Sequence, residues 1–183
     1  WHIGRRNVGH GEDPRYAAWR QQHGASWWWF SWVKVFFLQA TIAWMVSWPI
    51  GAALAPAPAF PSPWDLAGLA IAIGGLAFEA VADEQLRRFK ATTPKGTVCG
   101  VGLWRYSRHP NYFGESVVWW GLYVVAAGVP GGWWTFVSPL LMTWLLLEVS
   151  GVTLLEKSLT STQPGYADYV RRTSAFVPRA PRA

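Results

Sequence analysis

Charged residues are scarce in this sequence of 183 residues: Asp, Glu, Lys and Arg make up 14% of it, whereas hydrophobic residues make up 51%. Average soluble domains carry about 25% charged residues. A soluble globular domain is therefore a poor match, and the composition favours a chain whose main solvent is the lipid bilayer. The 15 tryptophans fit this expectation, because tryptophan concentrates at the two membrane interfaces.

Cysteine and the common motifs of soluble enzymes are nearly absent. The single cysteine, Cys99, excludes an internal disulfide and any site built from several cysteines. The four histidines lack the close spacing of metal ligands, so we expect no metal site. No Walker loop, HExxH or GxSxG sequence occurs, and Gly100 and Gly102 lack the third glycine of a dinucleotide-binding turn.

A signal peptide and a nucleic-acid-binding motif are also missing. The chain has no starting methionine, basic leader or cleavage site, and it begins abruptly at Trp1, so we expect it to be a portion of a longer protein. Its net charge of +6 could attract nucleic acid, but no base-reading motif occurs. The basic residues lie beside apolar segments, so lipid headgroups are the expected partner and nucleic acid is not.

Long apolar segments are what the sequence does have. About 20 apolar residues are needed to cross a hydrocarbon core roughly 30 Å thick, and four segments approach or reach that length. We therefore expect an all-α fold, a multi-pass transmembrane helix bundle with about four spans. The segments run from about Val33 to Leu54, Trp64 to Ala82, Tyr112 to Gly128 and Trp133 to Leu155.

Two of these segments carry proline or glycine at informative positions. Pro49 is expected to kink the far end of the first span, because proline removes a helical hydrogen bond. In the second span, Gly68, Gly74 and Gly75 are expected to let a neighbouring helix approach closely, because they have no side chain to keep the backbones apart.

The basic residues are distributed unevenly. With four crossings, all 16 Lys and Arg residues fall on one side of the membrane, because the loops 55–63 and 129–132 carry none. The positive-inside rule then puts both ends in the cytoplasm. We expect a single membrane domain over residues 1–183, with a cytosolic surface segment (1–30), a helical pair (31–86), a cytosolic motif loop (87–112), a helical hairpin (113–155) and a cytosolic tail (156–183).

A charged ladder continues the second span. Four residues spaced by four, four and three lie on one helix face as it leaves the membrane: Glu79, Asp83, Arg87 and Lys90. One interpretation is a self-paired ladder in which Asp83 binds Arg87. The other is a pocket, because carboxylates near the end of a span usually point into a protein interior rather than into lipid.

The stretch GVGLWRYSRHPNYFGE, residues 100–115, holds a polar cluster at the mouth of the third apolar helix. An isolated charge there costs several kcal/mol unless it is paired or faces water. Arg105 and Arg108 could simply lie among lipid headgroups. The alternative is a cationic pocket for an anionic ligand, to which the carboxylates of the ladder add the opposite charge. The cluster itself consists of Arg108, His109, Asn111 and Glu115.

The tail adds ionisable and aromatic residues. Glu156 lies at the cytoplasmic end of the last helix and is the better functional candidate there, whereas the deeper Glu148 fits a structural role. A short amphipathic stretch follows, which could either complete a site or anchor the chain at the membrane interface. Its candidate residues are Tyr166, Tyr169, Arg171 and Arg172.

The motif stretch resembles a known signature. GLWRYSRHPNYFGE, at 102–115, resembles the RHPNYxGE/D signature of the steroid 5-alpha-reductase and sterol reductase-like membrane family, and more closely its bacterial branch. The tail sequence EKSLTSTQPGYADYVRRTSAFVP (156–178) is similar to that group's closing pattern, and GEDPRY (11–16) looks like the bacterial branch. Isoprenylcysteine carboxyl methyltransferases and phospholipid methyltransferases share the RHPxYxG core.

This resemblance implies a multi-pass enzyme of the bacterial inner membrane that binds NADPH from the cytosolic side and passes hydride to a carbon–carbon double bond of a lipophilic substrate. The family's N-terminal helices and its proton-donating tyrosine would precede Trp1, which leaves Tyr112 as the candidate catalytic acid. Glu79 stands where the steroid enzymes have asparagine. The positions that resemble cofactor contacts are Asp83, Arg87 and Lys90 on the ladder, Arg105, Arg108, His109, Asn111 and Glu115 in the motif stretch, and Glu156, Tyr166, Tyr169 and Arg172 in the tail.

Two other functions stay open at this point. An S-adenosylmethionine-dependent membrane methyltransferase would bind a cofactor without phosphate, so it would not require Arg87 and Lys90. Its close relatives carry paired glutamates in the last helix region, where this chain has Glu156 followed by lysine. The third possibility is a non-enzymatic membrane protein, against which the carboxylates at a spacing of four argue.

Overall fold

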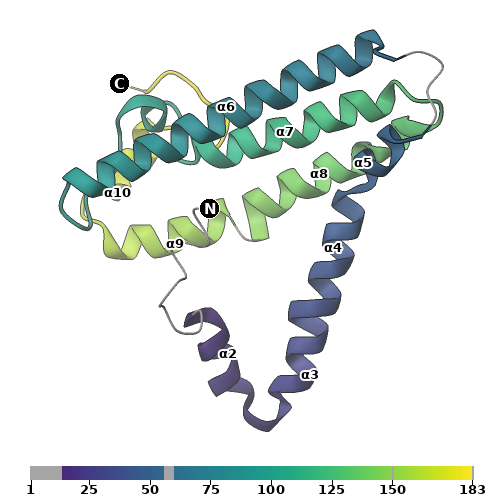
Figure 1. The fold of residues 1–183 in the computed structure, drawn as a ribbon. Coiled ribbons are helices and arrows are strands. Elements are labelled where there is room, and N and C mark those ends of the chain that lie inside the picture. The colour runs from purple at the N-terminus through teal and green to yellow at the C-terminus, as the bar shows by residue number, and fades with distance from the viewer. Residues whose placement is uncertain (1–13, 56–59, 150, 183) are drawn as a thin grey trace. The chain divides into compact units, whose positions relative to one another are not determined.

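The computed structural model describes residues 14–55, 60–149 and 151–182 (Figure 1). These residues form helices and contain no strand, which confirms the predicted all-α class. The contacts divide the chain into two compact units, Trp1–Met45 and Val46–Ala183. Residues 1–13, which hold much of the predicted surface segment and the first half of GEDPRY, lie outside the described residues.

The described part of the first unit is helical from Pro14 onward. The sequence predicted a loop and a short helix before the first span, and α2 (Pro14–His23) is a short helix in that segment. Aromatic rings pack near the start of this helical run: the ring of His23 stacks on that of Phe30 with centroids 3.8 Å apart, and Trp19 meets the same ring edge-on at 5.7 Å. The run consists of α2 (Pro14–His23), a 3-10 turn (Gly24–Ser26), α3 (Trp27–Ser31), a π-helical turn (Trp32–Phe37) and α4 (Leu38–Val46).

The helix is interrupted near Pro49, as predicted. α4 ends at Val46, and α5 (Trp48–Ala53) begins with Pro49 in its first turn, where the missing N–H is not needed. Within the second unit, the carbonyl of Val46 accepts a hydrogen bond of 2.5 Å from the Ser138 hydroxyl. The break in the helix is therefore fixed by a side chain from another helix.

The second unit is built around α6 (Pro63–Thr92), which starts at a well-formed cap. The Ser62 hydroxyl accepts from the Asp65 N–H at 3.2 Å, and the Asp65 carboxylate accepts from the Ser62 N–H at 2.7 Å. At 1.5 Å per residue, its 30 residues reach about 45 Å, which exceeds a hydrocarbon core of roughly 30 Å. The charged C-terminal end of α6 therefore extends beyond the hydrocarbon core, as the spacing of Glu79, Asp83, Arg87 and Lys90 predicted.

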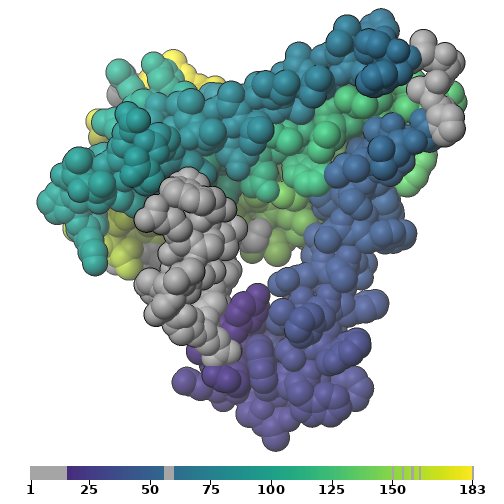
Figure 2. Space-filling view, in the orientation of Figure 1, coloured from purple at the N-terminus to yellow at the C-terminus, as the bar shows by residue number. Residues whose placement is uncertain are grey.

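Glycines bring α6 and α7 (Pro110–Ala127) together along their length (Figures 1 and 2). A Cβ added at Gly75 would lie 2.8 Å from the carbonyl oxygen of Gly114, and one added at Gly68 would lie 2.6 Å from that of Gly121. Each pair of glycines is seven residues apart on its helix, so both lie on one face. A Cβ added at Gly74, in contrast, would have no atom of the described residues within 4 Å, and the prediction that Gly74 mediates helix packing is wrong.

The helix α8 (Val137–Trp144) lies on the other side of α7 from α6 (Figure 1). The Ser116 hydroxyl on α7 lies 2.9 Å from that of Thr143, which joins α7 to the following helix. The elements after α7 are a 3-10 turn (Gly132–Phe136), α8, a π-helical turn (Leu145–Val149), α9 (Val152–Thr162) and α10 (Tyr166–Arg172).

Three of the described helical runs are long and apolar enough to cross a membrane: Tyr16–Val46, Pro63–Thr92 and Gly132–Val149. Apolar side chains on α6, such as Leu69, Ile73 and Leu76, are 54–59% exposed, as expected of a surface that contacts lipid. α7 is similar in length to the third run but carries Asn111 and Glu115 near its start. The fourth crossing and the orientation of the ends stay predictions.

The glycine contacts predict different effects at two adjacent positions. Gly75→Ala would place a methyl group against the backbone of α7, so we expect a loss of about 1–3 kcal/mol in unfolding free energy. Gly74→Ala is the matched control and should leave stability unchanged or raise it by up to about 1 kcal/mol, because alanine favours helix. Thermal unfolding in detergent measures both; equal melting temperatures would contradict the assigned packing face.

Candidate functional site

The motif stretch is anchored to α6 before it enters α7. A 3-10 turn (Gly102–Arg105) places the buried side chain of Trp104 against α6, where its indole N–H donates to the Ala82 carbonyl at 2.9 Å. The backbone N–H of Leu103 donates to the side-chain oxygen of Gln85 at 2.8 Å. The start of α7 is therefore fixed relative to the point where α6 becomes charged.

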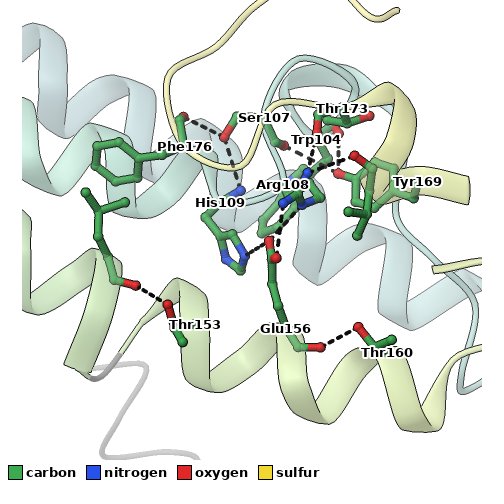
Figure 3. A network of polar contacts seen from close by, with 12 residues as sticks. Trp104, Ser107, Arg108, His109, Thr153, Glu156, Thr160, Tyr169, Thr173 and Phe176 are labelled. Atoms are coloured by element: carbon green, nitrogen blue, oxygen red, sulfur yellow. Dashed lines mark hydrogen bonds and ion pairs between the residues drawn. The ribbon is translucent and has the colours of Figure 1, made fainter. Parts of the chain in front are cut away.

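Arg108 makes the central ion pair of the site (Figure 3). Its guanidinium is bidentate on Glu156, with Nε at 2.7 Å and Nη2 at 3.0 Å from the two carboxylate oxygens. Nη1 donates to the carbonyls of Val170, at 3.1 Å, and Thr173. Only 8% of the Arg108 side chain is exposed, so this cation is held by the tail rather than by water.

The neighbours of Arg108 bind the tail as well (Figure 3). Nε2 of His109 lies 3.2 Å from the Glu156 carboxylate. The Ser107 hydroxyl accepts from the His109 N–H at 3.1 Å and donates to the Phe176 carbonyl at 2.7 Å. The Arg108 N–H donates to the Ser174 carbonyl at 2.8 Å, within an isolated parallel β-bridge.

α10 contacts the motif stretch through the side chain of Tyr169. The buried hydroxyl of Tyr169 donates to the carbonyls of Trp104 and Ser107. Tyr166 is 3% exposed, and its hydroxyl is sealed from solvent without a hydrogen bond in the described part of the chain. Burial raises the pKa of Tyr166 to about 12, with the nearby Glu156 charge adding to the rise, so this phenol stays protonated. We call Ser107, Arg108, His109, Glu156 and Tyr169 the motif–tail clamp.

Glu156 is ionised within the clamp. Burial favours its neutral form, but hydrogen bonds from His109 and Arg108 outweigh that effect and lower its pKa from the ordinary 4.5 to about 2. The clamp therefore contains a carboxylate and a guanidinium that both carry full charge at neutral pH, with the imidazole of His109 beside them.

A second group, of carboxylates, lies next to the clamp. Glu79 and Asp83 on α6 and Glu115 on α7 are close enough for their charges to interact, and the Tyr112 hydroxyl lies near two of them. In the described part of the chain, none of the three carboxylates forms an ion pair with a basic side chain. The ring of His109 stacks on that of Tyr112, with centroids 5.6 Å apart and planes 2° apart, which links the two groups.

The self-paired ladder, one of the two interpretations of the sequence, does not form between Asp83 and Arg87. Arg87 donates from Nε at 2.7 Å and from Nη2 at 2.8 Å to Glu84, not to Asp83. Arg88 donates to the same carboxylate at 2.6 Å. Both arginines are more than half exposed. Asp83 is thus left with the other carboxylates, and the cationic side of the ladder faces solvent.

The structure divides the predicted cofactor contacts, together with the candidate catalytic acid Tyr112, into three sets. Arg108, His109, Glu156, Tyr166 and Tyr169 lie in or against the clamp. Tyr112, Asp83 and Glu115 form the neighbouring group, and Asn111 is half-buried, with its Oδ1 sealed from solvent and without a hydrogen bond in the described part of the chain. Four basic residues are exposed: Arg87, Lys90, Arg105 and Arg172.

Sequence reasoning missed several residues that build the site. Trp104, Ser107 and Gln85 make hydrogen bonds that fix the motif stretch, and the Thr173 carbonyl accepts from Arg108. No spacing rule points to them, because their partners lie 18 to 69 positions away along the chain.

Comparison with known proteins identifies the family. Residues 1–173 match the model of a family described as "Protein of unknown function (DUF1295)". The chain belongs to the DUF1295 family. No curated protein and no solved structure matched the chain. The matched region contains every residue of the motif–tail clamp.

We expect Glu156, in the clamp, to contribute much more to folding stability than the exposed Asp168. Glu156→Gln would leave the buried Arg108 without a counter-ion, so we expect a loss of about 3–5 kcal/mol in unfolding free energy. Asp168→Asn removes an exposed ion pair with Arg171 and should cost less than about 1 kcal/mol. Chemical unfolding of the two variants in detergent compares them, and a similar small loss in both would show that Glu156 does not hold the clamp.

The lowered pKa of Glu156 predicts how stability depends on pH. Because the folded value lies below the unfolded value, the contribution of this carboxylate is complete above about pH 4.5 and is lost as pH falls toward about 2. Melting temperatures between these limits should fall more steeply for the wild-type chain than for Glu156→Gln. Parallel curves would contradict the assignment.

Proposed function

We propose that this DUF1295 protein is an integral membrane reductase that uses NADPH to reduce a carbon–carbon double bond of a lipophilic substrate. The observation that carries the proposal is the group of Glu79, Asp83 and Glu115, which has no ion-pair partner in the described chain and lies beside the clamp. Glu79 and Glu115 are half-buried, whereas Asp83 beside them is exposed. A half-buried carboxylate is costly unless it accepts hydrogen bonds. A ligand rich in hydroxyl and amide donors would supply those bonds.

The side chains around this group fit the parts of NADPH. The buried Oδ1 of Asn111 lacks a donor, and a nicotinamide carboxamide has one. Asp83 and Glu115 would accept from ribose hydroxyl groups. Three exposed cations would face the phosphates: Arg87 and Lys90 at the charged end of α6, and Arg105 in the motif stretch. When bound, this cofactor supplies the hydride.

The clamp would position the reacting end of the site. Arg108 uses four of its five N–H groups on protein acceptors, so we assign it to orienting His109 rather than to binding phosphate. His109 in turn holds the ring of Tyr112 by stacking. A phenol keeps its proton at neutral pH, so Tyr112 could protonate one carbon of the double bond while the other carbon receives hydride.

The membrane arrangement supports a lipophilic substrate. Apolar helices reach the site from the bilayer, and the basic residues around it favour the cytoplasmic side, where NADPH is available. The resemblance of RHPNYFGE to the steroid 5-alpha-reductase-like signature points to the same reaction class.

One observation favours a second function. Carboxylates without a basic partner also suit the ammonium and sulfonium charges of S-adenosylmethionine, and the RHPxYxG core is shared with membrane methyltransferases. A methyltransferase is therefore the alternative.

Cofactor titration separates the two functions. The purified chain should gain thermal stability with NADPH, and S-adenosylmethionine should have no effect. Asp83→Ala, Asn111→Ala and Arg87→Ala should each weaken NADPH binding by about tenfold, because each removes one polar or charged contact.

The control for Arg87 is Arg171→Ala, since both arginines are exposed and form an ion pair with an acidic residue three positions earlier. This variant should bind NADPH as the wild type does. Stabilisation by S-adenosylmethionine alone would replace the reductase with the methyltransferase, and wild-type affinity in all three site variants would remove the assigned site.

A further inference from the structure

A separate cleft lies beyond the clamp and the carboxylate group. It has a volume of about 560 Å³ and opens between the α6–α7 connection and the turn that joins α9 to α10. Its size falls within the range of small-molecule sites, about 300–1,000 Å³. None of the residues proposed above to contact NADPH lines it. The lining residues are Lys95, Gly96, Thr97, Val98, Thr162, Pro164 and Gly165.

Backbone N–H groups on both walls of the cleft are unused. On one wall, the Thr97 N–H closes a turn on the Pro94 carbonyl at 3.3 Å, and Gly96 adopts φ +88°. On the other wall, Gly165 adopts φ +82°. Among the described residues, no acceptor binds the N–H groups of Gly96, Val98 or Gly165. The bonded N–H of Thr97 separates those of Gly96 and Val98, so the free N–H groups are single donors on two segments, each able to donate to an anion.

The charge of the lining has one sign. Among the described residues that line the cleft, Lys95 is the only ionisable one, and none carries a carboxylate. The nearby acid on α10, Asp168, is paired with Arg171, and Glu156 on α9 is paired with Arg108. A bound anion would therefore meet a lysine and free amide donors without a competing negative charge.

We propose that this cleft binds a phosphate ester. The phosphate lies against Lys95 and the free N–H groups of Gly96 and Gly165, and the organic part of the ester lies against the apolar surface of Val98 and Pro164. The volume exceeds what phosphate alone would fill, so the ligand carries a further group. Two sources provide this chemistry: the headgroup of an anionic lipid or a soluble phosphate ester.

The experiment uses the complete chain in phosphatidylcholine nanodiscs. Glycerol 3-phosphate, followed by isothermal titration, probes the soluble source. Added phosphatidic acid in the nanodiscs, followed by the melting temperature, probes the lipid source. Lys95→Ala removes the proposed contact, and Lys157→Ala is the matched control, because it removes the same charge from an exposed position on α9 outside the cleft.

Saturable binding of glycerol 3-phosphate that weakens about tenfold in Lys95→Ala, but not in Lys157→Ala, would support the site and a soluble ligand. Stabilisation by phosphatidic acid alone, lost only in Lys95→Ala, would support the site and a lipid ligand. The proposal is overturned if neither probe gives a response that depends on Lys95, or if both lysine variants lose it equally. Asp83→Ala, at the proposed NADPH site, should leave both responses unchanged.

Discussion

The bidentate ion pair between Arg108 and Glu156 is the interaction on which the rest of the site depends. Both charges are largely removed from water, and such a pair is stable only when its geometry is good and its other hydrogen bonds are made. Here the tail carbonyls of Val170 and Thr173 complete the guanidinium. The pair thereby fixes His109, which immediately precedes α7, against Glu156, 47 positions later in the sequence.

The packing of α6 against α7 places the remaining side chains around this pair. Gly75 and Gly114 let the two backbones touch, so Glu79, Asp83 and Glu115 come close to one another. Without that close approach, the carboxylates on α6 would be too far from Glu115 on α7 to form one site. The stacked rings of His109 and Tyr112 then connect the carboxylates to the clamp, and this connection makes a single site of elements from three parts of the chain.

Helical period and length were sufficient to predict the all-α class, the charged end of α6 and the break at Pro49. They could not show which of two adjacent glycines, Gly74 or Gly75, faces α7. The rotation of α6 about its own axis turns Gly75 toward α7. They could not predict the partner of Arg87 either, because Asp83 and Glu84, four and three residues earlier, are both within reach of its side chain. In the rotamer that Arg87 adopts, it donates to Glu84. The contacts of Ser107 and Trp104 are long-range, so no local pattern encodes them.

The most direct test of the clamp is a double-mutant cycle for unfolding free energy with Arg108→Met, Glu156→Leu and the double variant. Each single change leaves one buried charge without its partner, whereas the double change removes both. The account predicts that the double variant is less destabilised than the sum of the single variants by about 2 kcal/mol or more. Additive losses would contradict it, because they would mean that the two side chains do not interact in the folded protein.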